Sequence, residues 1–250
     1  MHPILFQLGP LTLRGYGLMM ALGFMAGIAL ALGLSRREGR KDEVVLDLSV
    51  WIMAGAIFGA RLLYVLVQPE AYLKNPLEIL YLWEGGLVYY GGLIGAGITA
   101  FVWLRKHRQP IWQVADCLAP GLALGQVFGR IGCYFNGCCY GKVDAVYGVV
   151  FPGLGDGLPH LPTQLYEAGF VLVLALFLLW FKGRRGYPGQ VFWIYVALYA
   201  AGRFWLETLR GDSERGVLFW GVLSPGQWIS LLGLVAALIF HLRHHHKKSS

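Results

Sequence analysis

The stretch YGLMMALGFMAGIALALGL, residues 16–34, decides the class of fold because it carries no charged residue. About 20 consecutive apolar residues in a helix cross the hydrocarbon of a bilayer. The whole chain is 56% hydrophobic and only 14% charged, whereas soluble domains carry about 25% charged residues. We therefore expect a single integral-membrane domain over residues 1–250.

Six further apolar stretches predict an all-α polytopic membrane protein with about seven transmembrane helices. The expected spans are residues 16–34, 48–68, 87–104, 111–128, 165–181, 189–207 and 221–242. The fourth contains Asp116 and Pro120, which neighbouring helices can accommodate inside a membrane. The first has no basic segment before it and more spans follow, so a cleaved signal peptide is not expected.

Basic residues gather in every second connection, and this pattern sets the orientation. The four clusters are Arg36, Arg37, Arg40 and Lys41; Arg105, Lys106 and Arg108; Lys182, Arg184 and Arg185; and Arg243, Lys247 and Lys248. Lys and Arg concentrate in cytoplasmic loops, so the N-terminus is expected outside and the C-terminus in the cytoplasm. The net charge of +7 is then a topology signal, and no nucleic-acid partner is expected.

Three longer connections, residues 70–86, 131–164 and 208–222, fall on the outer side, where we expect them to form a small cap. Tyr72, Tyr81 and Trp83 suit an aromatic belt at the level of the lipid headgroups. Function concentrates in such loops, so the cap is where a site is expected.

Charged residues in or beside the spans are the first candidates for that site. They are Arg14, Arg61, Arg130, Arg203, Glu207 and Arg210. Arg203 and Glu207 lie one helical turn apart and share a face. A charge at the bilayer centre costs roughly 2.5–3.5 kcal/mol or more, so it indicates function; the alternative is snorkelling to the headgroups. Because the planar guanidinium fits phosphate, we expect a site for an anionic lipid.

Glycines are the second recurring feature of the spans. Gly55 with Gly59, and Gly121, Gly125 and Gly129, are spaced for close approach of helices. A second group is denser than packing requires and is expected to let backbone approach a ligand. Its members are Gly85, Gly86, Gly91, Gly92 and Gly95.

Cysteines form a third group, with Cys133, Cys138 and Cys139 following Arg130 and Cys117 in the fourth span. A disulfide from Cys133 to Cys138 or Cys139 suits an oxidising outer face, and a catalytic thiol remains an alternative. A metal site is disfavoured because His160 is the one plausible partner in the outer loops. A structural role is the preferred interpretation, and no metal or other cofactor is expected. The tail histidines, His241 and His244 to His246, indicate a solvated tail or an opportunistic metal binder.

Motifs in a fixed order then give nearly the whole chain a family resemblance. They are residues 13–18 (LRGYGL), 59–64 (GARLLY), 83–86 (WEGG) with 91–95 (GGLIG), 129–141 (GRIGCYFNGCCYG), 162–167 (PTQLYE) and 202–207 (GRFWLE). Together they resemble the prolipoprotein diacylglyceryl transferases. Three positions depart from the family's usual pattern: Tyr90 stands where it commonly has histidine, Cys133 where it has asparagine, and Cys138 where it often has an acid.

The resemblance implies a transferase of the bacterial inner membrane. It would move a diacylglyceryl group from phosphatidylglycerol to the lipobox cysteine of prolipoprotein precursors, the first step of lipoprotein maturation. The implied catalytic residues are Arg130, Arg203, Glu207 and Tyr90. The implied substrate contacts are Arg14, Tyr16, Arg61, Gly91, Gly92, Gly132, Cys133, Asn136, Gly141, Gln164, Tyr166 and Arg210.

Other functions stay open at the level of sequence. The same fold can serve a different acceptor, or bind an anionic lipid without catalysis, or use the cysteines in thiol redox chemistry. A transporter is the least favoured, because the chain shows no internal repeat.

Overall fold

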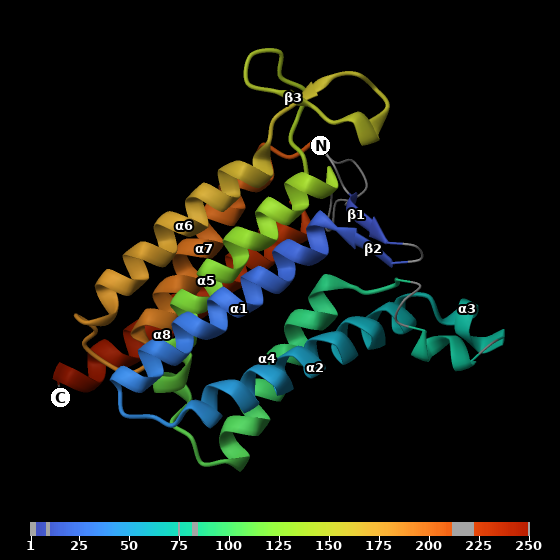
Figure 1. Cartoon of the computed structure of the whole chain (residues 1–250). Helices are drawn as coiled ribbons and strands as arrows, with labels where there is room; N and C mark the ends of the chain where they lie inside the picture. Colours follow the sequence, from blue (N-terminus) through green and yellow to red (C-terminus); the bar gives the residue numbers. More distant parts are fainter. Residues whose placement is uncertain (1–3, 9–10, 75, 82–84, 212–222, 250) are drawn as a thin grey trace. The chain divides into compact units, whose positions relative to one another are not determined.

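Long helices make up most of the computed structural model, which describes residues 4–8, 11–74, 76–81, 85–211 and 223–249. The described part holds seven of 18 residues or more: α1 (Gly15–Arg37), α2 (Asp42–Val67), α4 (Tyr89–Lys106), α5 (Ile111–Asn136), α6 (Thr163–Lys182), α7 (Gln190–Thr208) and α8 (Pro225–Ser249) (Figure 1). Each overlaps one predicted span, which confirms the all-helical class. Residues 221–222 of the last predicted span, and Trp83 of the predicted aromatic belt, lie outside the described residues.

Four helices of the described part are long and apolar enough to cross a membrane: α1, α2, α6 and the segment Pro225–His244 of α8. Large apolar side chains such as Phe24, Phe58 and Leu232 are exposed on these helices. A bilayer turns such exposure into favourable contact, because lipid tails are as apolar as the side chains. The chain is therefore a multi-pass membrane protein.

The chain forms two compact units, a larger one of residues 1–31 and 115–250 and a smaller one of residues 32–114. In the larger unit, α5, α6 and α7 share an apolar core around Ala119, Leu174 and Leu178, all at most 3% exposed. Helix α8 packs along α7. Helices α5, α6 and α7 carry Arg130, Glu167, Arg203 and Glu207.

Glycines bring α1 and α5 into backbone contact within the larger unit. A Cβ on Gly27 would lie 2.7 Å from the carbonyl oxygen of Gly121, and one on Gly23 would lie 2.8 Å from that of Gly125. No real Cβ tolerates such a distance. The predicted packing role of Gly121 and Gly125 is confirmed, and their partners are the glycines of α1.

Asp116, the charged residue inside the fourth predicted span, binds the start of α7. Its two carboxylate oxygens accept the backbone N–H groups of Gly189 at 2.8 Å and Phe192 at 3.0 Å. Arg185 lies 3.4 Å from the same carboxylate. A negative charge at a helix N-terminus satisfies donors that have no partner within the helix, so the buried acid caps a neighbouring helix.

The smaller unit is built on α2 and α4, which pack along each other. Gly59 faces Gly91, and Gly55 faces Gly95, at distances that leave no room for a Cβ on any of them. The predicted packing pair on α2 is confirmed. Gly91 and Gly95 lie in the same helix contact, and the predicted approach of a ligand to the glycine-rich segment stays a prediction.

Short elements lie outside the long helices, and the spacing of apolar residues did not predict them. Strands β1 (Ile4–Leu8) and β2 (Leu11–Arg14) pair antiparallel just before α1, and β3 (Val149–Val150) pairs with β4 (Pro159–His160). The remaining elements are α3 (Pro69–Lys74), η1 (Pro76–Leu80) and η3 (Pro152–Leu154). Elements of two to six residues carry too few apolar positions to show a period.

Candidate active site

Four charged side chains from three helices form a continuous row in the larger unit. Arg130 of α5 binds one carboxylate oxygen of Glu167 of α6 at 2.8 Å. Arg203 of α7 binds the other oxygen at 3.3 Å and also forms an ion pair with Glu207, one turn further along its own helix. The row therefore alternates in sign from α5 through α6 to α7. We call Arg130, Glu167, Arg203 and Glu207 the charged row.

The charged row is shielded from solvent and balanced in charge. The side chains of Glu167 and Glu207 are 3% and 6% exposed, and those of Arg203 and Arg130 are 12% and 20% exposed. Two positive and two negative charges cancel, which is what burial of ions requires. The arginines, the more exposed members, are the ones that an incoming anion can reach.

Glu167 is held from several sides and acts as the centre of the row. Besides the two arginines it accepts the hydroxyl of Tyr199 at 3.1 Å, on the oxygen that also binds Arg130. These three donors come from two neighbouring helices, α5 and α7, and hold the carboxylate in place. Its evident effect is to fix the positions of both guanidinium groups.

Glu207 is held by the start of α8. Ser224 donates its hydroxyl to Glu207 at 3.0 Å. Ser224 also caps α8 through a reciprocal pair with Gln227, a capping box whose two hydrogen bonds measure 3.0 and 3.2 Å. A Cβ on Gly226 would lie 3.2 Å from the Glu207 carboxylate, so glycine lets the positive end of the helix approach this acid.

The loop after α5 lies against the start of α6 and the end of α7. Gln164 is 1% exposed and donates to the carbonyl of Cys138 at 2.7 Å. Gly141 pairs with Arg210 in a β-bridge, and a Cβ on Gly141 would overlap Leu161 and the carbonyl of Leu209. The structure thus places Gln164, Gly141 and Arg210 beside the loop that follows α5, and their contacts with substrate stay predictions.

Tyr16 and Gly132 also meet, because a Cβ on Gly132 would lie 3.3 Å from the ring of Tyr16. Tyr16 interacts electrostatically with Arg130 and with the three loop cysteines. Asn136 ends α5, Tyr166 lies half-exposed in the first turn of α6, and Arg14 is exposed at the end of β2. Within the larger unit, Tyr16 and Gly132 therefore lie near the charged row.

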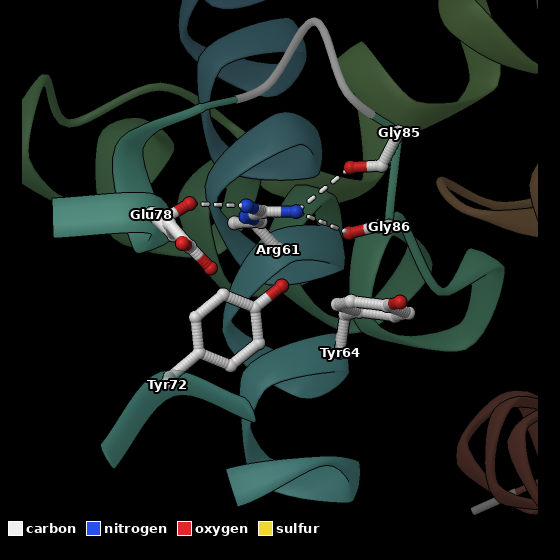
Figure 2. A pocket seen from close by; sticks show the side chains of 6 residues that line it. All are labelled: Arg61, Tyr64, Tyr72, Glu78, Gly85 and Gly86. Carbon is white, nitrogen blue, oxygen red and sulfur yellow. Dashed lines mark hydrogen bonds between the residues drawn. The ribbon is translucent and has the colours of Figure 1, made fainter. Parts of the chain in front are cut away.

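Arg61 belongs to the smaller unit and has its own set of partners (Figure 2). Its guanidinium donates to the backbone carbonyls of Glu78 at 2.6 Å, Ile79 at 2.9 Å and Gly85 at 2.7 Å, and to that of Gly86 at 3.2 Å. The side chain is 6% exposed and lies 5.4 Å from the ring centre of Tyr72. These contacts tie the segment after α3 to α2, and a headgroup contact by Arg61 stays a prediction.

Tyr90, Gly91 and Gly92 also lie in the smaller unit, in the first turn of α4. Tyr90 is half-buried and its ring meets that of Tyr89 edge to face at 5.7 Å. Gly91 packs on Gly59. A Cβ added to Gly92 would lie 3.3 Å from the carbonyl oxygen of Ala56. Their roles in catalysis and substrate binding stay predictions.

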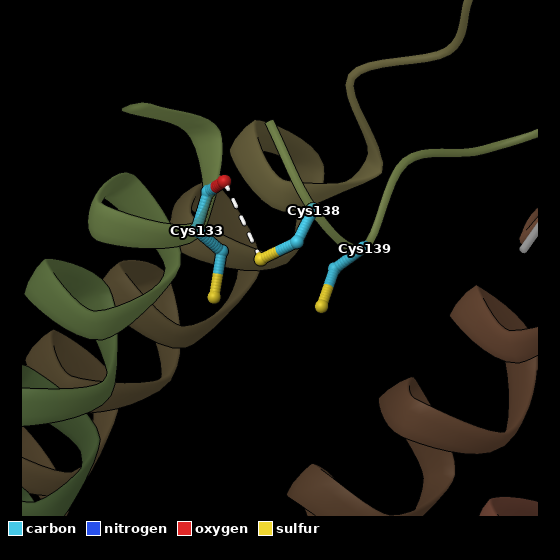
Figure 3. A group of neighbouring side chains, drawn as sticks. All are labelled: Cys133, Cys138 and Cys139. Atoms are coloured by element: carbon cyan, nitrogen blue, oxygen red, sulfur yellow. Dashed lines mark hydrogen bonds between the residues drawn. The ribbon is translucent and has the colours of Figure 1, made fainter. Parts of the chain in front are cut away.

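The three loop cysteines lie close together and are not joined by a disulfide (Figure 3). All four cysteines of the chain are described, and none forms a disulfide. The sulfurs of Cys133, Cys138 and Cys139 all lie within 4.8 Å of one another. Cys117 is buried elsewhere, 3.3 Å from the Lys182 ammonium.

Glu167, Tyr199 and Ser224 belong to the site, yet no role was predicted for them. Glu167 is the last residue of the motif 162–167. The available signal was an acid two residues into an apolar run, because a buried carboxylate requires a cation from another helix. Tyr199 and Ser224 carry no such signal, since both residue types are common in membrane helices and at helix starts.

The sequence matches one protein family over nearly its whole length. A model of the family described as prolipoprotein diacylglyceryl transferase matches residues 3–243. The phosphatidylglycerol–prolipoprotein diacylglyceryl transferase of Clostridium tetani is 37% identical over 242 residues, which cover 95% of this chain and 96% of the relative. Proteins of the same name from Bordetella parapertussis and Geobacter sulfurreducens are 39% and 38% identical, over 96% of this chain and 94% and 96% of their own lengths.

Proposed function

The chain belongs to the prolipoprotein diacylglyceryl transferase family, and we propose that it transfers the diacylglyceryl group of phosphatidylglycerol to the lipobox cysteine of a prolipoprotein. This is the first step of bacterial lipoprotein maturation. The names of the relatives supply both substrates, a phospholipid and a protein precursor. The apolar helices indicate that the chain lies in a membrane, where a phospholipid substrate also resides.

The reaction exchanges one bond for another. A carbon–sulfur bond forms between the cysteine and the glyceryl carbon, while the bond from that carbon to the phosphate oxygen breaks. Glycerol phosphate leaves with the electron pair, and the cysteine gives up its proton, because the thiolate is the nucleophile. The site must therefore stabilise the negative charge that develops on the departing phosphate.

The observation that carries the assignment is that one buried carboxylate, Glu167, holds two arginines from different helices. Each guanidinium has five N–H donors, more than its carboxylate contacts use. Donors fixed before the reaction stabilise developing charge without reorganising. We assign the departing phosphate to Arg130 and Arg203, with Glu207 orienting Arg203.

The remaining predicted residues take supporting roles in the proposal. Tyr16 interacts with Arg130 of the charged row, and the backbone of Arg210 binds that of Glu207. Together with Gly132 and Gln164 of the same unit, they suit contacts to headgroup or peptide. The residues whose roles rest on the sequence and on the family are Arg14, Arg61, Tyr90, Gly91, Gly92, Cys133, Asn136, Gly141 and Tyr166.

We also propose that seven helices of one integral domain cross the inner membrane, with the N-terminus outside and the C-terminus in the cytoplasm. The charged row supports this topology, because its members lie at the end of α5, the start of α6 and the end of α7, and Ser224 immediately precedes α8. Antiparallel spans bring those ends to one side. The basic clusters lie at the opposite ends, which the positive-inside rule assigns to the cytoplasm.

The test is a direct assay of transfer. Detergent-purified protein is mixed with phosphatidylglycerol and a lipobox peptide, and the diacylglyceryl thioether and glycerol phosphate are measured by mass spectrometry. We expect both products from the native chain, none from Arg130→Ala, and normal yields from Arg37→Ala, a matched control in which the arginine is exposed.

The alternative functions give different results in the same assay. Lipid binding without glycerol phosphate would indicate a non-catalytic binder, and glycerol phosphate without peptide adduct would indicate another acceptor. Full activity in Arg130→Ala would remove the proposed role of the charged row while leaving the reaction intact.

A further inference from the structure

The end of α5 brings two cysteines together through its own backbone. Gly137 has φ of +70°, and its N–H binds the carbonyl of Tyr134 at 3.2 Å, while the N–H of Cys138 binds the carbonyl of Cys133 at 3.2 Å. These two bonds are the Schellman motif, whose geometry places the residue after the glycine against the residue five positions before it. Cys138 is therefore held against Cys133, and its sulfur lies 3.7 Å from the Cys133 carbonyl.

The third sulfur is brought in by an unusual backbone. Cys139 has φ of +68°, a left-handed conformation that costs a residue with a side chain about 1–2 kcal/mol. Two buried side chains of α6 hold the segment, since Gln164 donates to the carbonyl of Cys138 and Thr163 to that of Cys139, at 2.7 and 2.8 Å. The three sulfurs point into one space (Figure 3) and lie within 4.8 Å of one another.

Two arginines lie beside this space. The side chain of Arg210 forms a hydrogen bond with Cys139. Arg130 interacts electrostatically with Cys133 from the other side. A thiolate is the form of cysteine that binds metal ions.

We propose that Cys133, Cys138 and Cys139 form a three-thiolate site for a soft cation such as Zn²⁺. Zinc–sulfur bonds of about 2.3 Å in a tetrahedral arrangement hold the sulfurs about 3.8 Å apart. The present spacing therefore needs to contract by about 1 Å at most. Three thiolates and one Zn²⁺ carry a net charge of −1, which Arg210 beside Cys139 can balance.

Three protein ligands leave the fourth position of the ion to water. His160 is an unsuitable fourth ligand, because its ring nitrogens bind the carbonyl of Gly141 at 3.1 Å and the carboxylate of Asp156 at 2.8 Å. The three ligands thus all come from the segment between Cys133 and Cys139.

The test measures binding of Cd²⁺ and Zn²⁺ to the full chain in detergent, under reducing conditions and after treatment with a chelator. Short histidine-rich tracts can bind metal ions themselves, so the background carries His244→Ala, His245→Ala and His246→Ala. Cadmium reports on the ligands, because its thiolate complexes have an ultraviolet charge-transfer band that imidazole complexes lack. Cys117→Ser is the matched control, since that buried cysteine lies outside the cluster.

We expect one Cd²⁺ per chain with the thiolate band in the control, and neither in the variant with all three cysteines replaced by serine. Cys139→Ser should weaken binding by about tenfold or more, since loss of even an outer-shell partner typically costs that much. Circular dichroism verifies that each variant keeps its helices.

Absence of the band in the reduced control, or its persistence in the triple variant, would overturn the proposal. If the purified chain contains a disulfide among these cysteines, and the reduced chain still binds no metal ion, the result would overturn the metal site and indicate a redox pair. The readout needs no transferase activity, so it can fail while the proposed function stands.

Discussion

Arg130 on α5 and Arg203 on α7 bind opposite oxygens of a single carboxylate, that of Glu167, at 2.8 and 3.3 Å. The carboxylate sets the separation of the two cations and joins three helices. The same contact therefore serves the site and the stability of the larger unit.

Replacing Glu167 with glutamine should weaken both. The amide keeps the shape of the side chain but leaves two arginines opposite one acid, and breaking a buried ion pair costs about 3–5 kcal/mol. We expect a lower unfolding temperature in detergent and a transfer rate reduced at least about 100-fold, the loss that follows removal of one oriented charge stabiliser. Glu43→Gln, at an exposed glutamate of α2, should change neither, and a normal rate in Glu167→Gln would contradict the proposed role.

Arg203→Lys tests whether the guanidinium fork itself is required. Arg203 binds Glu167 and Glu207 at once, and a single ammonium cannot reproduce this planar arrangement. We expect the rate of thioether formation to fall by about 100- to 1,000-fold while helix content stays the same. Arg37→Lys is the control, and equal rates for the two variants would show that positive charge alone suffices.

Two glycines of α4 offer a matched pair for the helix contact in the smaller unit. A Cβ on Gly91 would overlap the carbonyl of Gly59, whereas one on Gly97 meets nothing within 4 Å. Gly91→Ala should lower stability by about 1–3 kcal/mol through overpacking, and Gly97→Ala should preserve it or raise it by up to about 1 kcal/mol. Thermal unfolding followed by circular dichroism measures both, and similar shifts would refute the contact.

The β3–β4 segment should loosen in acid. A hydrogen bond with His160 holds the pKa of Asp156 below its ordinary value of 3.8. The stabilisation is complete above the ordinary value and disappears as the pH falls through the lower, folded pKa. Hydrogen exchange of residues 142–162, relative to Asp156→Asn, should show protection in the native chain only above that lower pKa. A constant ratio across this range would rule out the interaction.

The helices were largely predictable, because a segment that crosses a bilayer needs a long stretch of apolar residues. Each such stretch is visible in the sequence. Positions of glycine on α2 and α5 also predicted close packing, although the partner glycines of α1 were not identified. The strands β1 to β4 are too short to show a period. The division into two units depends on contacts distant in sequence, which composition does not reveal.

Three of the four residues of the charged row were named from the sequence. Arg130, Arg203 and Glu207 were identified because charges are rare in apolar helices, and the structure joins them. Glu167 was left without a role, since the spacing of residues within one helix cannot show which charge of another helix it meets. The cysteine cluster had a readable signal in Gly137, because a glycine after a helix brings together residues on either side of it.

Arg61 has a consequence for how the chain is made. The carbonyls that surround its guanidinium belong to residues 17 to 25 positions later in the chain. Burial of this cation therefore depends on a segment that emerges from the ribosome after α2. A charge in hydrocarbon without partners is costly, so we expect α2 and the segment that contains Glu78, Ile79, Gly85 and Gly86 to complete their insertion together.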